Sequence, residues 1–259
     1  MNSIFLKAEW RNLILANYEF DRTILQKYLP AKTEFDTCHG KDYVSLVGFL
    51  FKNTKVKGIA FPFHTTFEEV NLRFYVRYKV NNEWRRGVVF IKEIVPKSII
   101  AWIANTLYKE HYIACKMNHK WEFREKEKGE REKDDTLNVS YSWENPHVRH
   151  CGAPRSNLFQ YSNGISVEVE NKKLEIAVGS GEEFITEHYY GYSKFDEKIT
   201  GEYKVEHPRW MVYPVMDYTI KCDFGKNYGS DFKSLTGMKP NSVYLAEGSE
   251  IKVHGKVMK

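Results

Sequence analysis

Four polar side chains alternate with apolar ones along one short stretch of the sequence, and together they could bind an anionic ligand. Glu69, Asn71, Arg73 and Tyr75 occupy every second position, so an extended strand places them on one face. If that face lies inside the protein, Glu and Arg could pair at low dielectric, and a remaining donor could hold a carboxylate. If it faces solvent, the identities of these residues matter little. The pattern by itself leaves both interpretations open.

Two further segments mix titratable groups with aromatic rings, as ligand pockets do. They are Glu187-His188-Tyr189-Tyr190 and Glu206-His207-Pro208-Arg209-Trp210. Each is weak evidence alone, because a histidine beside tyrosines is more often a structural residue.

The sequence lacks the common catalytic and cofactor motifs. There is no phosphate-binding glycine loop, no GxSxG serine motif, no HExxH and no paired CxxC. His147, His150 and Cys151 lie close together, but no second cluster has the spacing of a metal site. We expect a solvated basic loop there, no metal and no cofactor.

The polar row belongs to the clearest strand of the sequence, residues 69–80, whose other face is apolar from Val70 to Val80. Asn81 and Asn82 predict a turn, and residues 87–95 predict the returning strand of a hairpin. Residues 43–51 are apolar on both faces, which predicts a strand covered on both sides.

The remaining pattern is rich in strands. We expect short helices at residues 21–29, 96–108 and 182–190, and strands at residues 112–123, 136–143, 165–169, 174–178, 198–206, 210–224 and 243–253, with 165–169 and 174–178 forming a hairpin. Residues 122–135 carry seven acids and five bases, so we expect the solvated tip of a hairpin and not a one-signed nucleic-acid arm.

Composition excludes several classes of protein. The 259 residues are 42% hydrophobic and 28% charged, which argues against collagen, coiled coil and disorder, and 15% aromatic residues favour strands. A net charge of +5 without a basic patch argues against nucleic-acid binding. The first residues lack a signal-peptide core and no apolar run is long enough to span a membrane, so we expect a soluble cytoplasmic protein without a membrane partner. Four scattered cysteines predict reduced thiols.

Segments across nearly the whole chain resemble the YqjF-like family of uncharacterised bacterial proteins. They are EWRNL, LPAKTEFDTCHGKDYVSLVGF, EEVNLRFYV, RRGVVF, YKEHYIACKM, EEFITEHYYGY and VEHPRW, in this order. That family is similar to the acetoacetate decarboxylase superfamily. The resemblance implies a curved, cone-like antiparallel β-barrel or sheet with helices packed outside and a ligand cavity within.

The decarboxylases attack a keto acid with a lysine amine whose pKa is depressed by a neighbouring lysine and a dry pocket. In the nearest register, His111 and Tyr112 stand where the family has proline and the reactive lysine. Glu110 beside Lys109 would stabilise its charged form. Lys116 is single, and Lys92 shares its alternation with Val88 and Phe90, which makes it the one plausible desolvated amine. The resemblance therefore predicts the fold without the Schiff-base chemistry.

We predict a single α+β domain over residues 1–259, mostly antiparallel β, with about ten or more strands and two or three short helices. We expect a cavity that binds a small organic, carboxylated ligand, with Arg73 taking the carboxylate and Glu69 or Glu187 either orienting Arg73 or acting as a general base. The expected cavity residues are Glu69, Asn71, Arg73, Tyr75, Tyr112, Glu187 and Tyr189. The alternative is an enzyme acting on a keto or hydroxy acid by carboxylate and tyrosine acid–base chemistry. Ligand identity and oligomeric state do not follow from the sequence.

Overall fold

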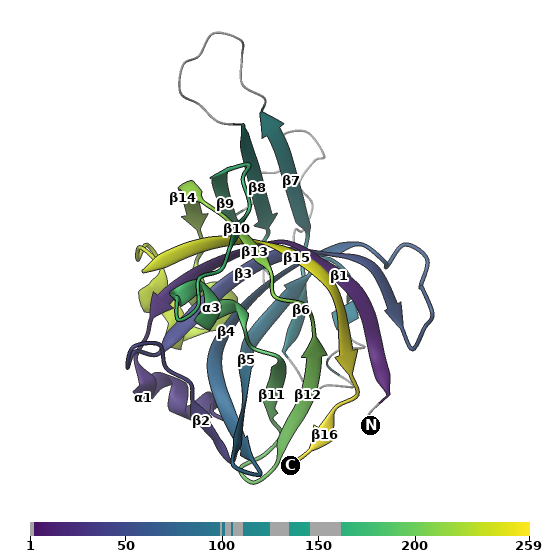
Figure 1. Cartoon of the computed structure of the whole chain (residues 1–259), viewed down its shortest axis with the longest axis vertical. Coiled ribbons are helices and arrows are strands. Elements are labelled where there is room, and N and C mark those ends of the chain that lie inside the picture. Colours follow the sequence, from purple (N-terminus) through teal and green to yellow (C-terminus); the bar gives the residue numbers. More distant parts are fainter. Residues whose placement is uncertain (1–2, 99, 102–104, 106–110, 125–134, 146–161) are drawn as a thin grey trace, which may run out of the picture.

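Two β-sheets make up most of the structure (Figure 1). The computed structural model describes residues 3–98, 100–101, 105, 111–124, 135–145 and 162–259. The large sheet has twelve strands in the order β10-β13-β15-β1-β3-β4-β5-β11-β12-β16, with β2 beside β4 and β6 beside β5. Its strands are β1 Ile4–Glu19, β2 Thr33–Phe35, β3 Tyr43–Val56, β4 Phe67–Val80, β5 Glu83–Val95, β6 Tyr112–Ala114, β10 Leu174–Glu175, β11 Tyr190–Lys194, β12 Thr200–Glu206, β13 Met211–Tyr213, β15 Ser242–His254 and β16 Val257–Met258.

The small sheet has four antiparallel strands in the order β14-β9-β8-β7 and stands at the top of Figure 1. The short helices lie around the two sheets. The bounds are β7 Met117–Arg124, β8 Thr136–Trp143, β9 Asn163–Glu170, β14 Val215–Lys221, α1 Arg22–Leu25, η1 Gln26–Tyr28, α3 Gly181–Thr186, α4 Phe224–Tyr228 and η2 Ser230–Leu235. Within the described residues, none of the helices has the length and apolar character needed to cross a membrane.

The large sheet curls until strands far apart along its path meet. β12 contacts β15 through two residue pairs, Val205 with Val253 and Glu206 with Lys252. Neighbouring strands are antiparallel except β5, which runs parallel to β6 and to β11. The result is a strongly curled sheet with an inner and an outer face, as expected, although it is not a strictly closed barrel.

Alternation along the strands gives each face of the curled sheet its own core. On β4, Val70, Leu72 and Phe74 are fully buried and face outward, where the small sheet, α4 and η2 cover them. Gly48 on β3 allows this close packing, because an added Cβ would lie 3.1 Å from atoms of Ile165 and Tyr141. The inner face packs a second core with Leu15, Val47 and Phe184 of α3 among its members. Strand β3 is therefore covered on both sides, which confirms that prediction.

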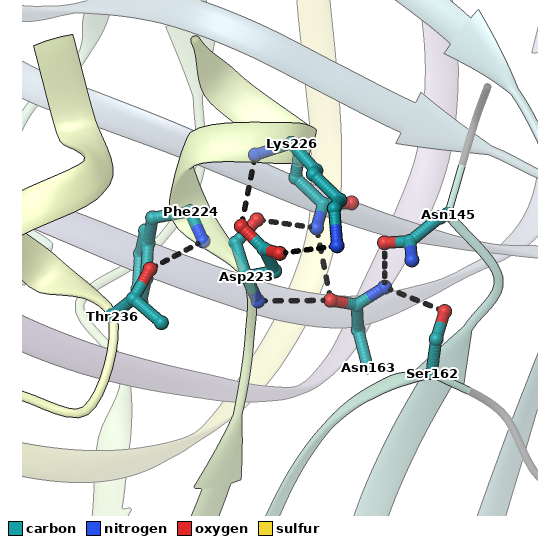
Figure 2. A network of polar contacts seen from close by, with 8 residues as sticks. Asn145, Ser162, Asn163, Asp223, Phe224, Lys226 and Thr236 are labelled. Carbon is teal, nitrogen blue, oxygen red and sulfur yellow. Dashed lines mark hydrogen bonds and ion pairs between the residues drawn. The ribbon is translucent and has the colours of Figure 1, made fainter. Parts of the chain in front are cut away.

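A polar network joins the small sheet to α4 (Figure 2). The Asn163 Oδ1 atom accepts from the backbone N–H of Asp223 at 3.1 Å and from Asn227 Nδ2 at 2.9 Å. Its Nδ2 atom donates to Asn145 Oδ1 at 3.0 Å. Trp143 Nε1 donates to Asn227 Oδ1 at 3.0 Å. Asn163 and Asn227 are almost completely buried, so these hydrogen bonds satisfy polar groups that would otherwise destabilise the core.

Most local predictions are confirmed. Asp21 caps α1 by accepting from Thr23 N, and Asn81 and Asn82 adopt positive φ at the β4–β5 turn. β7 and β8 form the expected hairpin, although residues 125–134 of its charge run lie outside the described part. Ser98, Ile100, Ala101 and Asn105 are helical, and the rest of the helix expected up to residue 108 is not described.

Three predicted strand assignments are wrong because the chain changes sheets. Residues 112–123 form two strands, β6 in the large sheet and β7 in the small sheet. Residues 210–224 also divide, into β13 of the large sheet and β14 of the small sheet. The break falls at Pro214, which lacks the N–H that a strand ladder needs. The hairpin expected from residues 165–169 and 174–178 does not form. β9 pairs with β8 and β14, whereas β10 pairs with β13.

Candidate ligand-binding site

The inner face of the curled sheet encloses a cavity of about 350 Å³. Strand β4 contributes the polar row to its wall: Glu69, Asn71 and Arg73 all line the cavity and are 3%, 1% and 8% exposed. Their neighbours Val70 and Leu72 point into the outer core. Of the two interpretations that the sequence left open, the structure shows the interior face.

A β-bulge on β5 decides which side chains face this row. Leu72 pairs with Lys92 but Arg73 pairs with Phe90, so one extra residue, Ile91, interrupts the alternation. Phe90 lines the cavity, whereas Lys92 faces outward, where its Nζ donates to the carbonyl of Asn227 at 2.5 Å. Burial lowers the pKa of Lys92, as expected of a desolvated amine. Its predicted place beside Val88 and Phe90 is wrong, because strict alternation does not continue through a bulge.

The same bulge turns Glu93 into the cavity, where it is 1% exposed. Glu93 lies opposite Asn71 on β4 and beside Tyr112 on β6. Glu69 accepts hydrogen bonds from Asn71 Nδ2 at 2.9 Å and from the Tyr112 hydroxyl at 3.3 Å. Glu69 and Glu93 thus give the cavity an acidic stretch of wall, in which Glu69 is already hydrogen-bonded.

Arg73 lies in different surroundings. Its Nη2 donates to the carbonyl of Ile185 at 3.4 Å, and its guanidinium lies 5.8 Å from the centre of the Tyr75 ring. Its Nε is buried without a hydrogen-bond partner, and among the described residues no carboxylate lies within ion-pair distance of it. The predicted burial of Arg73 is confirmed. The predicted pairing with a carboxylate is not found, since Glu69 is bound by Asn71 and Tyr112 instead.

Tyr75 packs next to Arg73 but does not itself line the cavity. Its hydroxyl lies 2.6 Å from Ser45 Oγ, and its ring lies 4.7 Å from that of His188. His188 lines the cavity, and its Nε2 donates to Asp36 at 3.1 Å, which Arg86 also binds at 2.6 Å. Burial lowers the pKa of His188 to about 4, although the bond to Asp36 acts in the opposite direction. His188 is therefore neutral at physiological pH.

Glu187 and Tyr189 lie beside the cavity, outside its lining. The Tyr189 hydroxyl donates to Glu187, and its ring stacks on His207 at 4.6 Å. Burial and this bond raise the pKa of Tyr189. His207 lines the cavity and stacks on Trp210 at 4.2 Å, and burial lowers its pKa.

The structure thus brings Glu69, Asn71, Arg73 and Tyr112 together in the cavity wall and leaves Tyr75, Glu187 and Tyr189 next to it. Sequence reasoning did not select Glu93, because only the bulge turns it inward. His188 and His207 stood in the two mixed clusters, but nothing local distinguished them from structural histidines. The described residues contain no group of three potential metal ligands, and His147, His150 and Cys151 lie outside the described part.

Comparisons with known proteins give the family and the fold of the chain. Residues 7–250 match the DUF2071 family, whose description is "uncharacterized conserved protein". The chain belongs to this family. One segment is 31% identical over 75 residues to the uncharacterized protein YqjF of Bacillus subtilis (strain 168). That match spans 29% of the chain and about a third (31%) of YqjF.

Solved structures similar to this DUF2071 chain share its acetoacetate decarboxylase-like fold. The enduracididine biosynthesis enzyme MppR, complexed with pyruvate, has a TM-score of 0.59 at 12% identity, covering 100% of this chain and 91% of MppR. An acetoacetate decarboxylase-like enzyme from Sphingomonas wittichii RW1 has a TM-score of 0.60 at 9% identity, with 99% and 94% covered. Acetoacetate decarboxylase from Legionella pneumophila has a TM-score of 0.57 at 12% identity, with 98% and 86% covered. At these identities the likeness extends to the fold alone.

Proposed function

We propose that this protein binds a small organic carboxylate in the inner cavity and that it does so without a Schiff-base lysine. The observation that carries the proposal is Arg73, a buried guanidinium in the cavity wall without a carboxylate partner among the described residues. A buried charge without a counter-ion is costly, and the planar guanidinium fork matches a carboxylate.

Two further observations support the proposal. None of the described residues that line the cavity is a lysine, and Lys92 donates to Asn227 on the outer side of the sheet. MppR, which has a similar fold, is described in complex with pyruvate, itself a carboxylate.

Thermal unfolding with pyruvate, benzoate and hexanoate at neutral pH tests the proposal. At least one acid should raise the melting temperature in a concentration-dependent way, because a ligand that binds the folded state stabilises it. Arg73→Gln should abolish the shift. Arg77→Gln is the matched control, since Arg77 lies on the same strand and pairs with Glu34. Equal shifts in wild type and Arg73→Gln would reject the role of Arg73.

A second candidate is an enzyme that moves a proton on a keto or hydroxy acid. The hydrogen bond between Tyr112 and Glu69 favours it, because a carboxylate and a phenol facing one cavity are an acid–base pair. Loss of the pyruvate methyl signal in D₂O, followed by proton NMR, would support this activity if Glu69→Gln abolished it. An exchange rate equal to that of buffer alone would leave the binding function.

A further inference from the structure

The shape and wall of the cavity narrow the class of ligand that Arg73 would bind; this inference rests on the function proposed above. The lining residues of β4 extend from Phe67 to Arg73, a distance of roughly 20 Å at the usual rise per strand residue. Together with the volume of about 350 Å³, this length exceeds what a molecule as small as pyruvate or acetoacetate can fill.

Aromatic rings form a large part of the wall around the polar row. Phe51 stacks on Phe67 at 4.7 Å, and Trp10 makes edge contacts with Phe49 at 5.4 Å and Trp210 at 6.2 Å. All five side chains line the cavity. Apolar walls bind ligands chiefly by removing apolar ligand surface from water, so a ligand that matches this cavity carries a large apolar body.

The two ends of the cavity differ in polarity and exposure. At the Arg73 end, Thr186 and His188 line the cavity and are both buried. At the Phe67 end, the connection between β3 and β4 lines the cavity with Phe61, which is 45% exposed. An occupant with its charge at the closed end and its apolar end toward Phe61 matches this arrangement.

Glu69 and Glu93 limit the charge of the occupant. Glu69 lies four residues from Arg73, about 13 Å along the strand, and Glu93 faces the same stretch of cavity. A second carboxylate on the ligand would be buried beside these acids, where the described cavity lining offers no second Arg or Lys to pair with it.

We propose that the occupant is an amphipathic monocarboxylic acid. Its carboxylate binds Arg73, and its apolar body, an alkyl chain or an aromatic ring system, fills the aromatic part of the cavity toward Phe61. Dicarboxylic acids of the same length are excluded by Glu69 and Glu93.

Calorimetric titration of the full chain tests this with acetate, hexanoate, octanoate, decanoate, pyruvate, acetoacetate and indole-3-acetate, and with decanol and the dicarboxylic acid sebacate as matched controls. Affinity should rise by about fourfold for each added methylene until the cavity is full. Decanoate or indole-3-acetate should exceed pyruvate at least a hundredfold, and their ranking distinguishes an alkyl from an aromatic body. Sebacate and decanol should bind at least tenfold more weakly than decanoate.

Variants separate this inference from the function on which it rests. Val56→Phe should weaken decanoate more than pyruvate, because Val56 lines the cavity where β3 ends, beside the connection that carries Phe61, and the larger ring fills this part. Val253→Phe serves if the first variant does not fold. Glu69→Gln should reduce the discrimination against sebacate. Pyruvate or acetoacetate binding as tightly as decanoate would overturn the amphipathic ligand and keep the carboxylate site. Decanol equal to decanoate, or no binding by any acid, would overturn both.

Discussion

The binding role proposed for Arg73 sets ligand binding against the stability of the ligand-free protein. Its guanidinium is 8% exposed, and its contacts among described residues are a long bond to Ile185 and the ring of Tyr75. Natural proteins retain such a group when it is needed for a ligand, and they lose stability for it. The proposed role of Arg73 can therefore be tested without a ligand, through the free energy of unfolding.

Replacing Arg73 with Met should stabilise the ligand-free protein. We expect the free energy of unfolding to rise by about 1–3 kcal/mol, because a desolvated charge is exchanged for an apolar side chain of similar length. Urea denaturation measures the change. Arg77→Met is the control and should be neutral or slightly destabilising, since it loses a half-exposed ion pair with Glu34 and the stacking of Arg77 on Trp84. A loss of stability in Arg73→Met would mean that Arg73 is structural.

His188 should make stability depend on pH. Its folded pKa of about 4 is below the ordinary 6.5, so the unfolded chain binds a proton over this interval and the folded protein does not. Protonation of His188 therefore costs no free energy of unfolding above about pH 6.5. As the pH drops to 4, the free energy of unfolding falls by up to about 3 kcal/mol. Arg73, Arg86 and Asp36 face this ring, and Asp36 extends the loss to lower pH, because hydrogen bonds from His188 and Arg86 outweigh burial and lower its pKa.

Urea denaturation across pH 4–7 measures this dependence. His188→Gln should flatten the profile in the same window, because an amide keeps a hydrogen bond to Asp36 and has no proton to gain. His64→Gln is the matched control, since His64 also lines the cavity but binds only a backbone carbonyl. An unchanged profile in His188→Gln would show that this histidine titrates normally.

Among the structural elements, β4 and β5 show what a sequence can and cannot predict. Alternation predicts the faces of β4 correctly from Glu69 to Tyr75, so the sequence is enough to identify the polar row. On β5 one extra residue, Ile91, reversed the faces of everything after it, which misplaced Lys92 and hid Glu93. A bulge depends on pairing with the neighbouring strand, so no local pattern within β5 revealed it.

The bulge on β5 carries a chemical prediction. Incubation with acetoacetate and borohydride should leave the intact mass unchanged, because Lys92 faces Asn227 and is directed away from the cavity. An ordinary lysine is only ~0.04% neutral at pH 7, and the decarboxylases overcome this with desolvation and a second cation. Acetoacetate decarboxylase under the same conditions is the positive control. A stoichiometric adduct on any lysine of this chain would restore the Schiff-base mechanism.

The pairing of β1 with β15 depends on a glycine. Gly248 has a φ of +77°, and an added Cβ would lie 2.0 Å from the carbonyl oxygen of Trp10. Gly248→Ala should lower the free energy of unfolding by more than about 3 kcal/mol, as both backbone strain and a clash act. Gly58→Ala is matched in φ, at +84°, but has open space and should lose only about 1–2 kcal/mol. Similar losses for the two variants, measured by urea denaturation, would refute the close contact.

At the scale of the whole molecule, the sequence predicted the curled sheet but not its connections. The strand-rich composition and the resemblance gave the fold class, whereas the closing contact of β12 with β15 and the parallel pairing of β5 with β11 join segments far apart in the chain. Periodicity identifies the buried face of a strand and not its partner. For the same reason, periodicity predicts a continuous strand or a local hairpin in three segments where the chain crosses between the sheets.

The two sheets should unfold together, because one core contains side chains of both, and Asn163 links the small sheet to α4. Asn163→Ala should lower the free energy of unfolding by about 1–3 kcal/mol by leaving buried partners unsatisfied, while the denaturant slope stays unchanged. Ser140→Ala, on β8, is the control and should change the free energy of unfolding by less than about 0.5 kcal/mol, since the Ser140 hydroxyl makes only a long bond to the carbonyl of Lys120.

Circular dichroism and tryptophan fluorescence should give coincident transitions in both variants, because Trp10 and Trp210 report on the cavity and Trp143 on the small sheet. A separate fluorescence transition, or a smaller slope in Asn163→Ala, would show that the small sheet unfolds independently and that residues 1–259 are not a single domain.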